Sequence, residues 1–310
     1  MKSLNDAAER IRRGELVAFP TETVYGLGAN ALDVAAVQKI FELKGRPQTS
    51  PLIVHVSSLE MARRYVTEWP AQAEALARQY WPGPLTLVLP KSPEIPDIVT
   101  AGLSTVGIRV PAHEIALQLI EAAGVPIAAP SANRFTGLSP TTAEHVRAAF
   151  GDAVPVLDGG ATRVGIESTV VSLAAGKIKL LRPGMISFAQ IEYATAAAGA
   201  AHPAPGMHAR HYSPRTHLIL VGGPEDLPGR DGAYLWWKRS GIVSRSIRMP
   251  SDAPRYAARL YSALHEVDRE RWPWIAVEAP PASPEWSGIW DRLRRAAAQA
   301  AGEHGQPNPS

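Results

Sequence analysis

Short apolar runs alternate with helical patterns over the first two-thirds of the chain, and this rhythm restricts the fold more than any other feature. The runs are often rich in β-branched residues, as buried strands are. They cover residues 16–19, 51–56, 85–89, 105–110, 125–129 and 168–173. The helical patterns between them cover residues 33–44, 113–123 and 141–150. Strands that alternate with helices are typical of an α/β domain.

End signals support these three helices. Asp33 is a good N-cap residue, and Gly124 and Gly151 follow helical patterns at the position where a left-handed glycine ends many helices. The sequence Ser-Pro-Thr-Thr-Ala-Glu at 139–144 is typical of a capped helix start.

A segment rich in Ala, Gly and Pro interrupts the rhythm at residues 194–216. This composition favours a linker, although residues 194–201 could equally end a helix. A second α/β pattern follows, with strand-like runs at 217–221 and 274–277 and helical patterns at 254–267 and 289–300. We therefore predict a larger domain over residues 1–193, a linker over 194–216 and a smaller α/β domain over 217–310.

Composition excludes several classes of protein. Of 310 residues, 45% are hydrophobic and 20% charged, which is typical of a globular chain and not of a disordered one. The chain has no cysteine, which excludes disulfides, thiolate metal sites and a thiol nucleophile. Neither a signal peptide nor a membrane-spanning stretch is evident, so we expect a cytoplasmic protein.

Charge is spread too evenly for a broad nucleic-acid footprint. Residues 1–200 contain 18 basic and 18 acidic side chains, and residues 201–310 supply the whole net charge of +3. A nucleic-acid-binding face would cluster its cations.

Common catalytic signatures are missing. The chain has no G-x-x-x-x-G-K-[ST], no H-E-x-x-H and no G-x-S-x-G. Gly26-Leu27-Gly28 is too short for a dinucleotide fingerprint. Compact polar clusters remain at the ends of the strand-like runs, where open α/β sheets usually bind ligands.

The first two clusters combine hydroxyls and cations. Residues 20–27 read Pro-Thr-Glu-Thr-Val-Tyr-Gly-Leu, which could also be a turn capped by its own hydroxyls. Lys44 and Arg46 flank a helix-ending glycine, and Ser50 follows. Lys44 could simply complement the helix dipole, but two cations and a hydroxyl also suit a polyphosphate. His55 lies inside a strand pattern, where a lone histidine is more often structural.

The remaining clusters are spread from residue 104 to the linker. Arg109 alternates with Ile108 and Val110, so it points to the opposite face of its strand, either at an edge or toward a ligand. Residues 130–133, Pro-Ser-Ala-Asn, lead toward a helix start and could contact a nucleotide, although Ser139 and Thr141 could also be simple N-caps. Two more clusters are Glu-Ser-Thr-Val-Val at 167–171 and Arg-Pro-Gly at 182–184. His208 and His211 have loose spacing and no adjacent carboxylate, which argues against a metal site.

Taken in order, these clusters resemble the YrdC-type family of L-threonylcarbamoyladenylate synthases. The matching motifs are Thr-Glu-Thr-Val-Tyr-Gly-Leu-Gly, Lys-x-Arg-Pro, Ser-Thr-Val-Gly-x-Arg-x-Pro, Pro-Ser-Ala-Asn, Ser-Pro-Thr, Ser-Thr-Val-Val and Arg-Pro-Gly. Pro-Gly-Met at 205–207 and His-Tyr-Ser-Pro at 211–214 resemble the long, two-domain form. The resemblance implies a twisted mixed sheet with flanking helices and a smaller Rossmann-like α/β C-terminal domain.

The resemblance also implies a reaction. Members of the family join L-threonine, bicarbonate or CO2, and ATP into threonylcarbamoyl-AMP, and they release pyrophosphate. A separate transferase complex then passes the threonylcarbamoyl group to adenosine 37 of tRNAs that read codons starting with A. The implied partners are therefore small molecules and that complex, with tRNA only an indirect partner. Mg2+ is expected to enter with ATP, without a dedicated metal site in the protein.

Roles for individual residues follow from the same resemblance. Lys44 and Arg46 would be catalytic and would contact the phosphates together with Ser50. The nucleotide would be contacted by Thr105, Ser131, Asn133, Ser139 and Arg182, and the linker residues His211 and Tyr212 would close over it. L-threonine would be contacted by Thr23, His55, Arg109, the backbone of Ala129 and Ser168.

Two other functions fit parts of the sequence. One is a double-stranded RNA or tRNA-binding module, against which the balanced charge of residues 1–200 counts. The other is an ATP-dependent carbamoyl or acyl adenylate enzyme with a different amine substrate.

Overall fold

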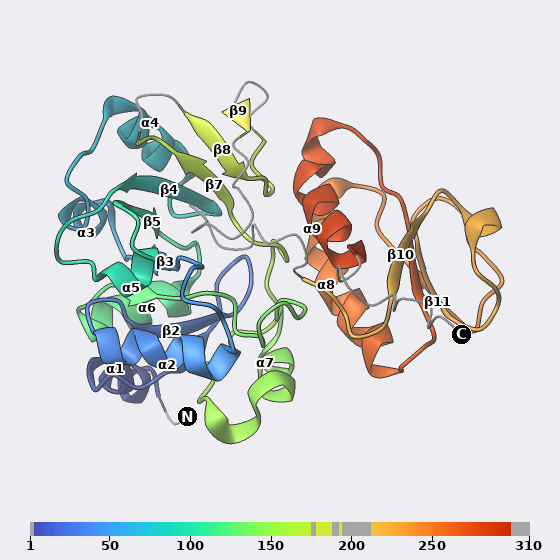
Figure 1. The fold of residues 1–310 in the computed structure, drawn as a ribbon, viewed down its shortest axis with the longest axis horizontal. Helices are drawn as coiled ribbons and strands as arrows, with labels where there is room; N and C mark the ends of the chain where they lie inside the picture. The colour runs from blue at the N-terminus through green and yellow to red at the C-terminus, as the bar shows by residue number, and fades with distance from the viewer. Residues whose placement is uncertain (1–2, 175–177, 188–191, 194–211, 299–310) are drawn as a thin grey trace, which may run out of the picture.

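Two β-sheets organise the computed structural model, which describes residues 3–174, 178–187, 192–193 and 212–298 (Figure 1). The larger sheet is mixed and has the order β1-β2-β6-β3-β5-β4-β7-β8-β9. Its strands are β1 (Val17–Phe19), β2 (Gly26–Asn30), β3 (Ile53–His55), β4 (Leu85–Pro90), β5 (Thr105–Arg109), β6 (Ile127–Ala128), β7 (Thr169–Ser172), β8 (Lys179–Arg182) and β9 (Glu192–Tyr193).

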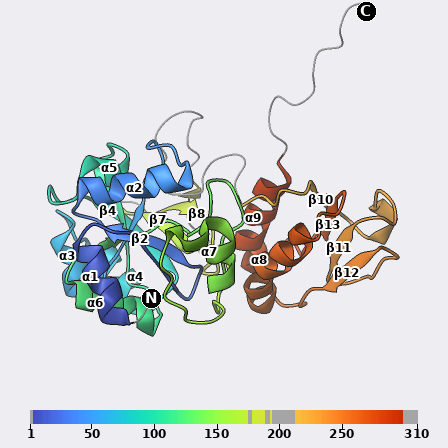
Figure 2. The ribbon, with the colours of Figure 1, turned by 90° about the horizontal axis from the view of Figure 1, so that it is seen from below.

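Helices cover both faces of this sheet. The helices α1 and α6 lie on one face, and α2 and α5 lie on the other (Figure 2). Apolar residues of α1 and α6 pack with Phe19 and Ile127, whereas the adjacent Ala128 belongs to a second core cluster. The helices are α1 (Leu4–Arg12), α2 (Val34–Lys44), α3 (Leu59–Arg64), α4 (Ala71–Tyr80), α5 (Asp97–Thr100), α6 (Glu114–Ala123) and α7 (Ala143–Phe150).

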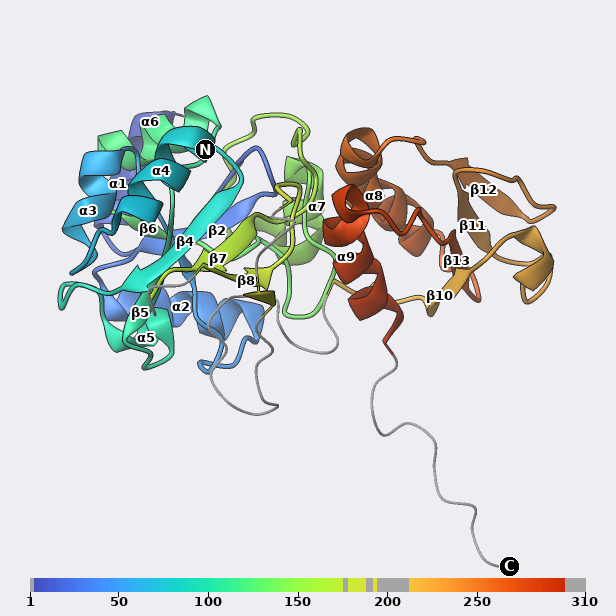
Figure 3. The ribbon, with the colours of Figure 1, turned by 90° about the horizontal axis from the view of Figure 1, so that it is seen from above.

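The smaller sheet is wholly parallel and has the order β10-β13-β11-β12. Its elements are β10 (Leu218–Val221), β11 (Ala233–Trp236), β12 (Arg245–Arg248), α8 (Ala253–Arg269), β13 (Ile275–Glu278) and α9 (Ser287–Ala297). Both α8 and α9 lie between this sheet and the rest of the molecule (Figures 1 and 3). We call β1–β9 with their helices the large-sheet unit, and β10–β13 with α8 and α9 the small-sheet unit.

The two units share a core and approach each other closely. Val24, Leu138 and Ile166 of the large-sheet unit belong to the same apolar cluster as the buried faces of α8 and α9. A Cβ atom on Gly288 would lie 2.6 Å from the carbonyl oxygen of Gly184, and one on Gly165 would lie 2.4 Å from that of Ala257. Such contacts between backbones tolerate only glycine at these positions. The interface is therefore tightly packed.

The predicted fold class is confirmed. Asp33 caps α2 through hydrogen bonds from the amides of Ala35 and Ala36, and Gly124 ends α6 with a left-handed φ of 68°. The sequence did not predict β2, because glycines disguise it. A Cβ on Gly28 would lie 2.8 Å from the Phe19 ring, so only glycine fits in this strand. Most of the predicted linker, residues 194–211, lies outside the described residues.

A stacked pair of histidines lies at the interface between the two units. The rings of His145 on α7 and His265 on α8 lie 3.8 Å apart. Burial lowers the pKa of His145 to about 3, with the charge of His265 adding to the effect, and burial lowers the pKa of His265 to about 4. Both rings are therefore neutral when folded, whereas in the unfolded chain they take up protons near pH 6.5.

The interface should lose stability as the pH falls below about 6.5, because protons then bind the unfolded chain preferentially. We predict that the double change His145→Gln and His265→Gln flattens the pH dependence of the free energy of unfolding between about pH 6.5 and pH 4. Urea denaturation across this range measures the slope. The exposed His217→Gln should keep the wild-type slope. A double variant with an unchanged slope would contradict the prediction.

Candidate active site

One cavity collects side chains from most of the polar clusters that the sequence analysis singled out. Its walls come from the large-sheet unit and from the segment that precedes β10. In the large-sheet unit they are the loop after β1, the start of β2, the loop after α2, the strands β3 and β5, the loop after β6, the residues before β7 and the end of β8. We call it the central cavity, and it is lined by Thr21, Thr23, Val24, Gly26, Arg46, Ile53, His55, Arg109, Ala129, Pro130, Ser131, Glu167, Ser168, Arg182 and Tyr212.

Hydrogen bonds fix the turn after β1 and the loop after β6, which line the central cavity. The hydroxyl of Thr21 donates to the carbonyl of Val24 at 2.7 Å and lies 2.8 Å from the hydroxyl of Thr23, which makes a tight turn after β1. The amide of Leu27 donates to the carbonyl of Pro130, and Gly26 pairs with Ser131 across an isolated bridge. The start of β2 and the loop after β6 are therefore held side by side.

Lys44 and Arg46 are buried, and backbone carbonyls surround their charges. The Lys44 ammonium donates to the carbonyls of Ser131 at 2.6 Å and Asn133 at 2.5 Å. Arg46 donates to the carbonyls of Ser50 and Pro51 at 3.4 and 3.2 Å. Burial lowers the pKa of Lys44 well below its ordinary value, with the charge of Arg46 adding to the effect, and burial lowers the pKa of Arg46 to about 10. Both groups would gain from an anion.

Arg109 forms a buried ion pair on the wall of the central cavity. Its Nη2 lies 2.7 Å from Oε1 of Glu22, and both side chains are under 5% exposed. The Nε of Arg109 donates to the carbonyl of Gly83, and Oε2 of Glu22 accepts from the amide of Ala112. Because β5 lies between β3 and β4, Arg109 occupies the sheet centre and not an edge.

Arg182 fixes the residues that precede β7. Its guanidinium donates to the carbonyl of Ser168 at 3.0 and 3.1 Å and to the Ser168 hydroxyl at 3.0 Å. The same hydroxyl lies 2.8 Å from that of Thr86. His55 completes this side of the cavity as a neutral ring, because burial and then the charge of Arg109 lower its pKa to about 3.

Tyr212, in the segment that leads into the small-sheet unit, lines the central cavity. This residue is buried, and its φ of 62° places it in the left-handed region that is uncommon for residues other than glycine. The next amide, of Ser213, donates to the carbonyl of Thr136 at 2.9 Å. The guanidinium of Arg292 lies 5.2 Å from the centre of the Tyr212 ring. The chain that enters the small-sheet unit is thereby attached to the large-sheet unit.

Nine of the predicted site residues line the central cavity: Thr23, Arg46, His55, Arg109, Ala129, Ser131, Ser168, Arg182 and Tyr212. Lys44, Ser50 and Asn133 lie behind its wall, where they hydrogen-bond to the lining loops or to Arg46. Ser139 donates to the carboxylate of Glu167 at 2.5 Å. Thr105 borders a neighbouring hollow that shares Ile53. His211 lies outside the described residues.

Two polar residues of the cavity wall, Thr21 and Glu167, and the nearby Glu22 were given no role in the site from the sequence. Thr21 and Glu22 belong to the first cluster, but nothing in the sequence shows that Glu22 pairs with a residue 87 positions away in β5. Glu167 precedes Ser168, and its main partner is Arg292 in the small-sheet unit. The only indication of a role in the sequence was that Glu167 directly precedes the hydroxyl residues Ser168 and Thr169 at the start of a strand.

Positive charge prevails around the central cavity. Lys44, Arg46, Arg109 and Arg182 surround it, and the nearby carboxylates of Glu22 and Glu167 each form an ion pair with an arginine. Buried cations with neutral hydroxyls beside them suit an anionic ligand with polar groups, such as a nucleotide. Within the part of the chain that the structure describes, no group of three His, Asp or Glu residues could hold a metal ion, and no helix is long and apolar enough to span a membrane.

Two family models match the chain. The Sua5–YciO–YrdC model, described as "Telomere recombination", covers residues 9–184, and the model described as "Threonylcarbamoyl-AMP synthase, C-terminal domain" covers residues 182–298. The chain belongs to the Sua5–YciO–YrdC family. The first model alone covers more than half of the chain, so the resemblance drawn from the motifs is confirmed.

Relatives of this Sua5–YciO–YrdC chain match nearly its whole length. The threonylcarbamoyl-AMP synthase of Pyrococcus abyssi is 44% identical, with 94% of this chain and 92% of the relative covered. The corresponding protein of Bacillus subtilis is 41% identical, with the same coverage. The crystal structure of P. abyssi Sua5 complexed with L-threonine superposes with a TM-score of 0.88 at 41% identity, covering 95% of this chain and 94% of that one.

The Glu22–Arg109 pair should be strongly coupled. Glu22→Gln leaves a buried guanidinium without its carboxylate and should lower the free energy of unfolding by about 3–5 kcal/mol. The double change Glu22→Gln and Arg109→Met removes both charges and should cost less than the two single changes together. A double-mutant cycle by urea denaturation measures this coupling. Additive costs would show that the two side chains do not stabilise each other.

Proposed function

We propose that this protein is a threonylcarbamoyl-AMP synthase, a nucleotidyltransferase that joins L-threonine, bicarbonate or CO2, and ATP and releases pyrophosphate. The observation that carries the proposal is the convergence of Arg46, Arg109 and Arg182 on one cavity that hydroxyl groups also line, with the Lys44 ammonium held behind its wall at the carbonyl of Ser131. The chain belongs to the Sua5–YciO–YrdC family, and its relatives in P. abyssi and B. subtilis are named threonylcarbamoyl-AMP synthases, which supports the same reaction.

We assign the phosphates of ATP to the part of the central cavity near Arg46 and Lys44. Arg46 would donate to them directly, and Lys44, whose ammonium is held beside the loop of Ser131, would add a second charge. Arg182 would face the nucleotide across the cavity. Asn133 and Ser139 would support this site from behind, because they hydrogen-bond to neighbouring loops and to Glu167. Ser50, Thr105 and His211 remain predicted contributors.

L-threonine is assigned to the side lined by Thr23, His55, the backbone of Ala129 and Ser168. Arg109 would pair with the substrate carboxylate while it keeps its bond to Glu22. His55 is neutral, so it can share a hydrogen bond with the substrate without adding charge. The related P. abyssi protein has been crystallised with L-threonine, which supports an amino-acid site in this fold.

The substrates supply the reacting groups. The amine of threonine attacks the carbon of CO2 and loses a proton, which gives a carbamate. A carbamate oxygen then attacks the α-phosphorus of ATP, the bond to the bridging oxygen breaks, and pyrophosphate leaves. The protein therefore has to orient the reactants and offset negative charge on the phosphates, which Lys44 and Arg46 would do.

Two further features suit this chemistry. Tyr212 is buried and lines the cavity, and exclusion of water there would protect the carbamate and the acyl-adenylate. Mg2+ would enter bound to the triphosphate, because the two carboxylates beside the cavity already pair with arginines.

We further propose a catalytic domain over residues 1–193, a closing linker over 194–216 and a C-terminal domain over 217–310. The product would pass to a threonylcarbamoyl transferase complex.

The reaction itself is testable by substrate omission. Pyrophosphate release from ATP should require both L-threonine and bicarbonate, because the nucleophile forms only when both are present. A coupled pyrophosphate assay, with mass spectrometry of the adenylate, measures this. Glycine and serine serve as controls and should give much less product. Equal release with either amino acid, or release without bicarbonate, would contradict the proposal.

Arg46→Ala tests the phosphate site. The change removes a charge-assisted contact worth about 1.5–3 kcal/mol, so KM for ATP should rise or turnover should fall by about 10- to 100-fold. Steady-state kinetics with ATP varied gives the effect, and circular dichroism checks the fold. The matched control is Arg78→Ala, an exposed arginine on α4. Wild-type kinetics in Arg46→Ala would remove this residue from the site.

A further inference from the structure

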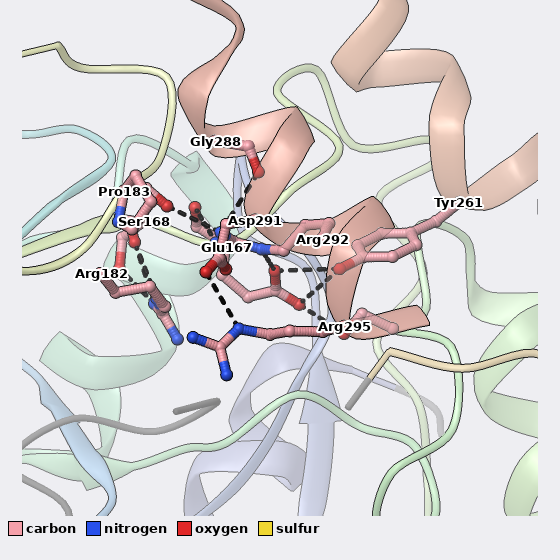
Figure 4. Close-up of polar contacts among 10 residues, drawn as sticks. Glu167, Ser168, Arg182, Pro183, Tyr261, Gly288, Asp291, Arg292 and Arg295 are labelled. Atoms are coloured by element: carbon pink, nitrogen blue, oxygen red, sulfur yellow. Dashed lines mark hydrogen bonds and ion pairs between the residues drawn. The ribbon is translucent and has the colours of Figure 1, made fainter. Parts of the chain in front are cut away.

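The buried carboxylate of Glu167 lies on the wall of the central cavity and forms an ion pair with a residue of the small-sheet unit. Glu167 lines the central cavity, yet its main partner is Arg292 on α9 (Figure 4). Nε of Arg292 donates to Oε2 of Glu167 at 2.7 Å, and Nη2 donates to the backbone carbonyl of Glu167 at 3.2 Å. The side chain of Arg292 is 1% exposed. This ion pair therefore joins the small-sheet unit directly to the candidate active site.

The same guanidinium contacts two other segments beside the cavity. Nη1 of Arg292 donates to the carbonyl of Pro183 at 2.7 Å, next to Arg182. The guanidinium also lies over the ring of Tyr212, which lines the cavity. One side chain of α9 thus contacts two residues of the cavity wall, Glu167 and Tyr212, and the backbone next to a third, Arg182.

Charge gives this contact a consequence beyond packing. A carboxylate on the wall of a cavity that receives a triphosphate would repel it, and repulsion is strong where water is excluded. Arg292 compensates that charge from behind the wall, on the side of the small-sheet unit. Without it, only the charge of Arg182 and hydrogen bonds from hydroxyls would compensate Glu167, a buried anion in the same cavity as the proposed phosphate site.

We propose that Arg292 is a positioning residue for ATP: it neutralises Glu167, and the small-sheet unit thereby sets the charge balance of the nucleotide site. This inference rests on the proposed function, because it assigns the central cavity to ATP. The inference gives the small-sheet unit a defined role in ATP binding.

Several groups face Glu167 from the elements packed around it. Burial raises the pKa of its carboxyl, but the charges of Arg292 and Arg182 outweigh burial and hold the pKa below its usual range. The hydroxyls of Ser139 and Tyr261 donate to the same carboxylate. Asp291, bonded to both Arg292 and Arg295, and His265, bonded to the Ser139 carbonyl, complete the surroundings.

Loss of Arg292 should therefore produce a pH-dependent defect. In Arg292→Gln, Glu167 loses the larger of the two arginine charges that oppose the effect of burial and keeps that of Arg182, so the pKa of Glu167 should rise. At about pH 8 the carboxylate is charged, and KM for ATP should rise by about tenfold or more. At about pH 6 a larger fraction is protonated, and the defect should shrink. The maximal rate at saturating ATP should change less than KM.

The experiment uses the full chain and a charge-removal rescue. KM for ATP and ATP affinity by calorimetry are measured for Arg292→Gln, Glu167→Gln and the double variant between about pH 6 and pH 8. The double variant has no uncompensated charge, so its KM should return to within about threefold of the wild type and lose the pH-dependent defect. The matched control is Arg294→Gln, an exposed arginine on the same helix, which should behave like the wild type.

Distinct outcomes separate the two proposals. A double variant as defective as Arg292→Gln, with a defect that does not vary with pH, would make Arg292 structural only and overturn the inference. If Arg292→Gln does not fold, Arg292→Lys retains the positive charge and should keep KM for ATP within about threefold of the wild type, and a tenfold rise would overturn the inference. A wild-type protein without threonine-dependent pyrophosphate release would contradict the proposed function instead, and calorimetry with ATP would still test the charge balance.

Discussion

Buried positive charge is the constraint on which the rest of this structure depends. Lys44, Arg46, Arg109 and Arg182 are each at most 6% exposed, and taking such groups out of water is costly unless something compensates. Backbone carbonyls and hydroxyls surround three of these cations, and Glu22 pairs with the fourth. Lys44 and Arg46, whose charges lie against carbonyl dipoles, can exchange part of that compensation for the charge of a ligand. The proposed triphosphate supplies that charge.

The small-sheet unit belongs to this arrangement. Its helices α8 and α9 share an apolar core with loops of the large-sheet unit, and glycines at 165, 184 and 288 let the backbones meet. Arg292 and Tyr261 reach across this interface to Glu167 on the cavity wall. A tight interface of this kind fixes the position of a charged side chain better than a flexible contact would.

The sequence was most informative where a local pattern decides the structure. Strict alternation in residues 105–110 predicted that Arg109 points away from Ile108, and in the structure Arg109 lines the central cavity while Ile108 is in the core. Helix ends at Asp33 and Gly124 were readable for the same reason, since caps depend on a few neighbouring residues. The order of the polar clusters then indicated a family and a common site.

Contacts between residues far apart in the chain could not be predicted from the sequence. Glu167 pairs with a residue 125 positions later, and no local pattern connects the two. The strand β2 escaped prediction because close packing against Phe19 demands glycine, which propensity counts against strands. The strands β11 and β12 lie in a Gly-, Asp- and Arg-rich segment and are defined by pairing within the small sheet.

The most direct test of the account is a crystal structure of the full chain with L-threonine and a non-hydrolysable ATP analogue. The account predicts phosphate oxygens within hydrogen-bonding distance of Arg46, the threonine carboxylate at Arg109, and Glu167 still paired with Arg292. Phosphates bound on another surface, or a nucleotide that never contacts the central cavity, would contradict it.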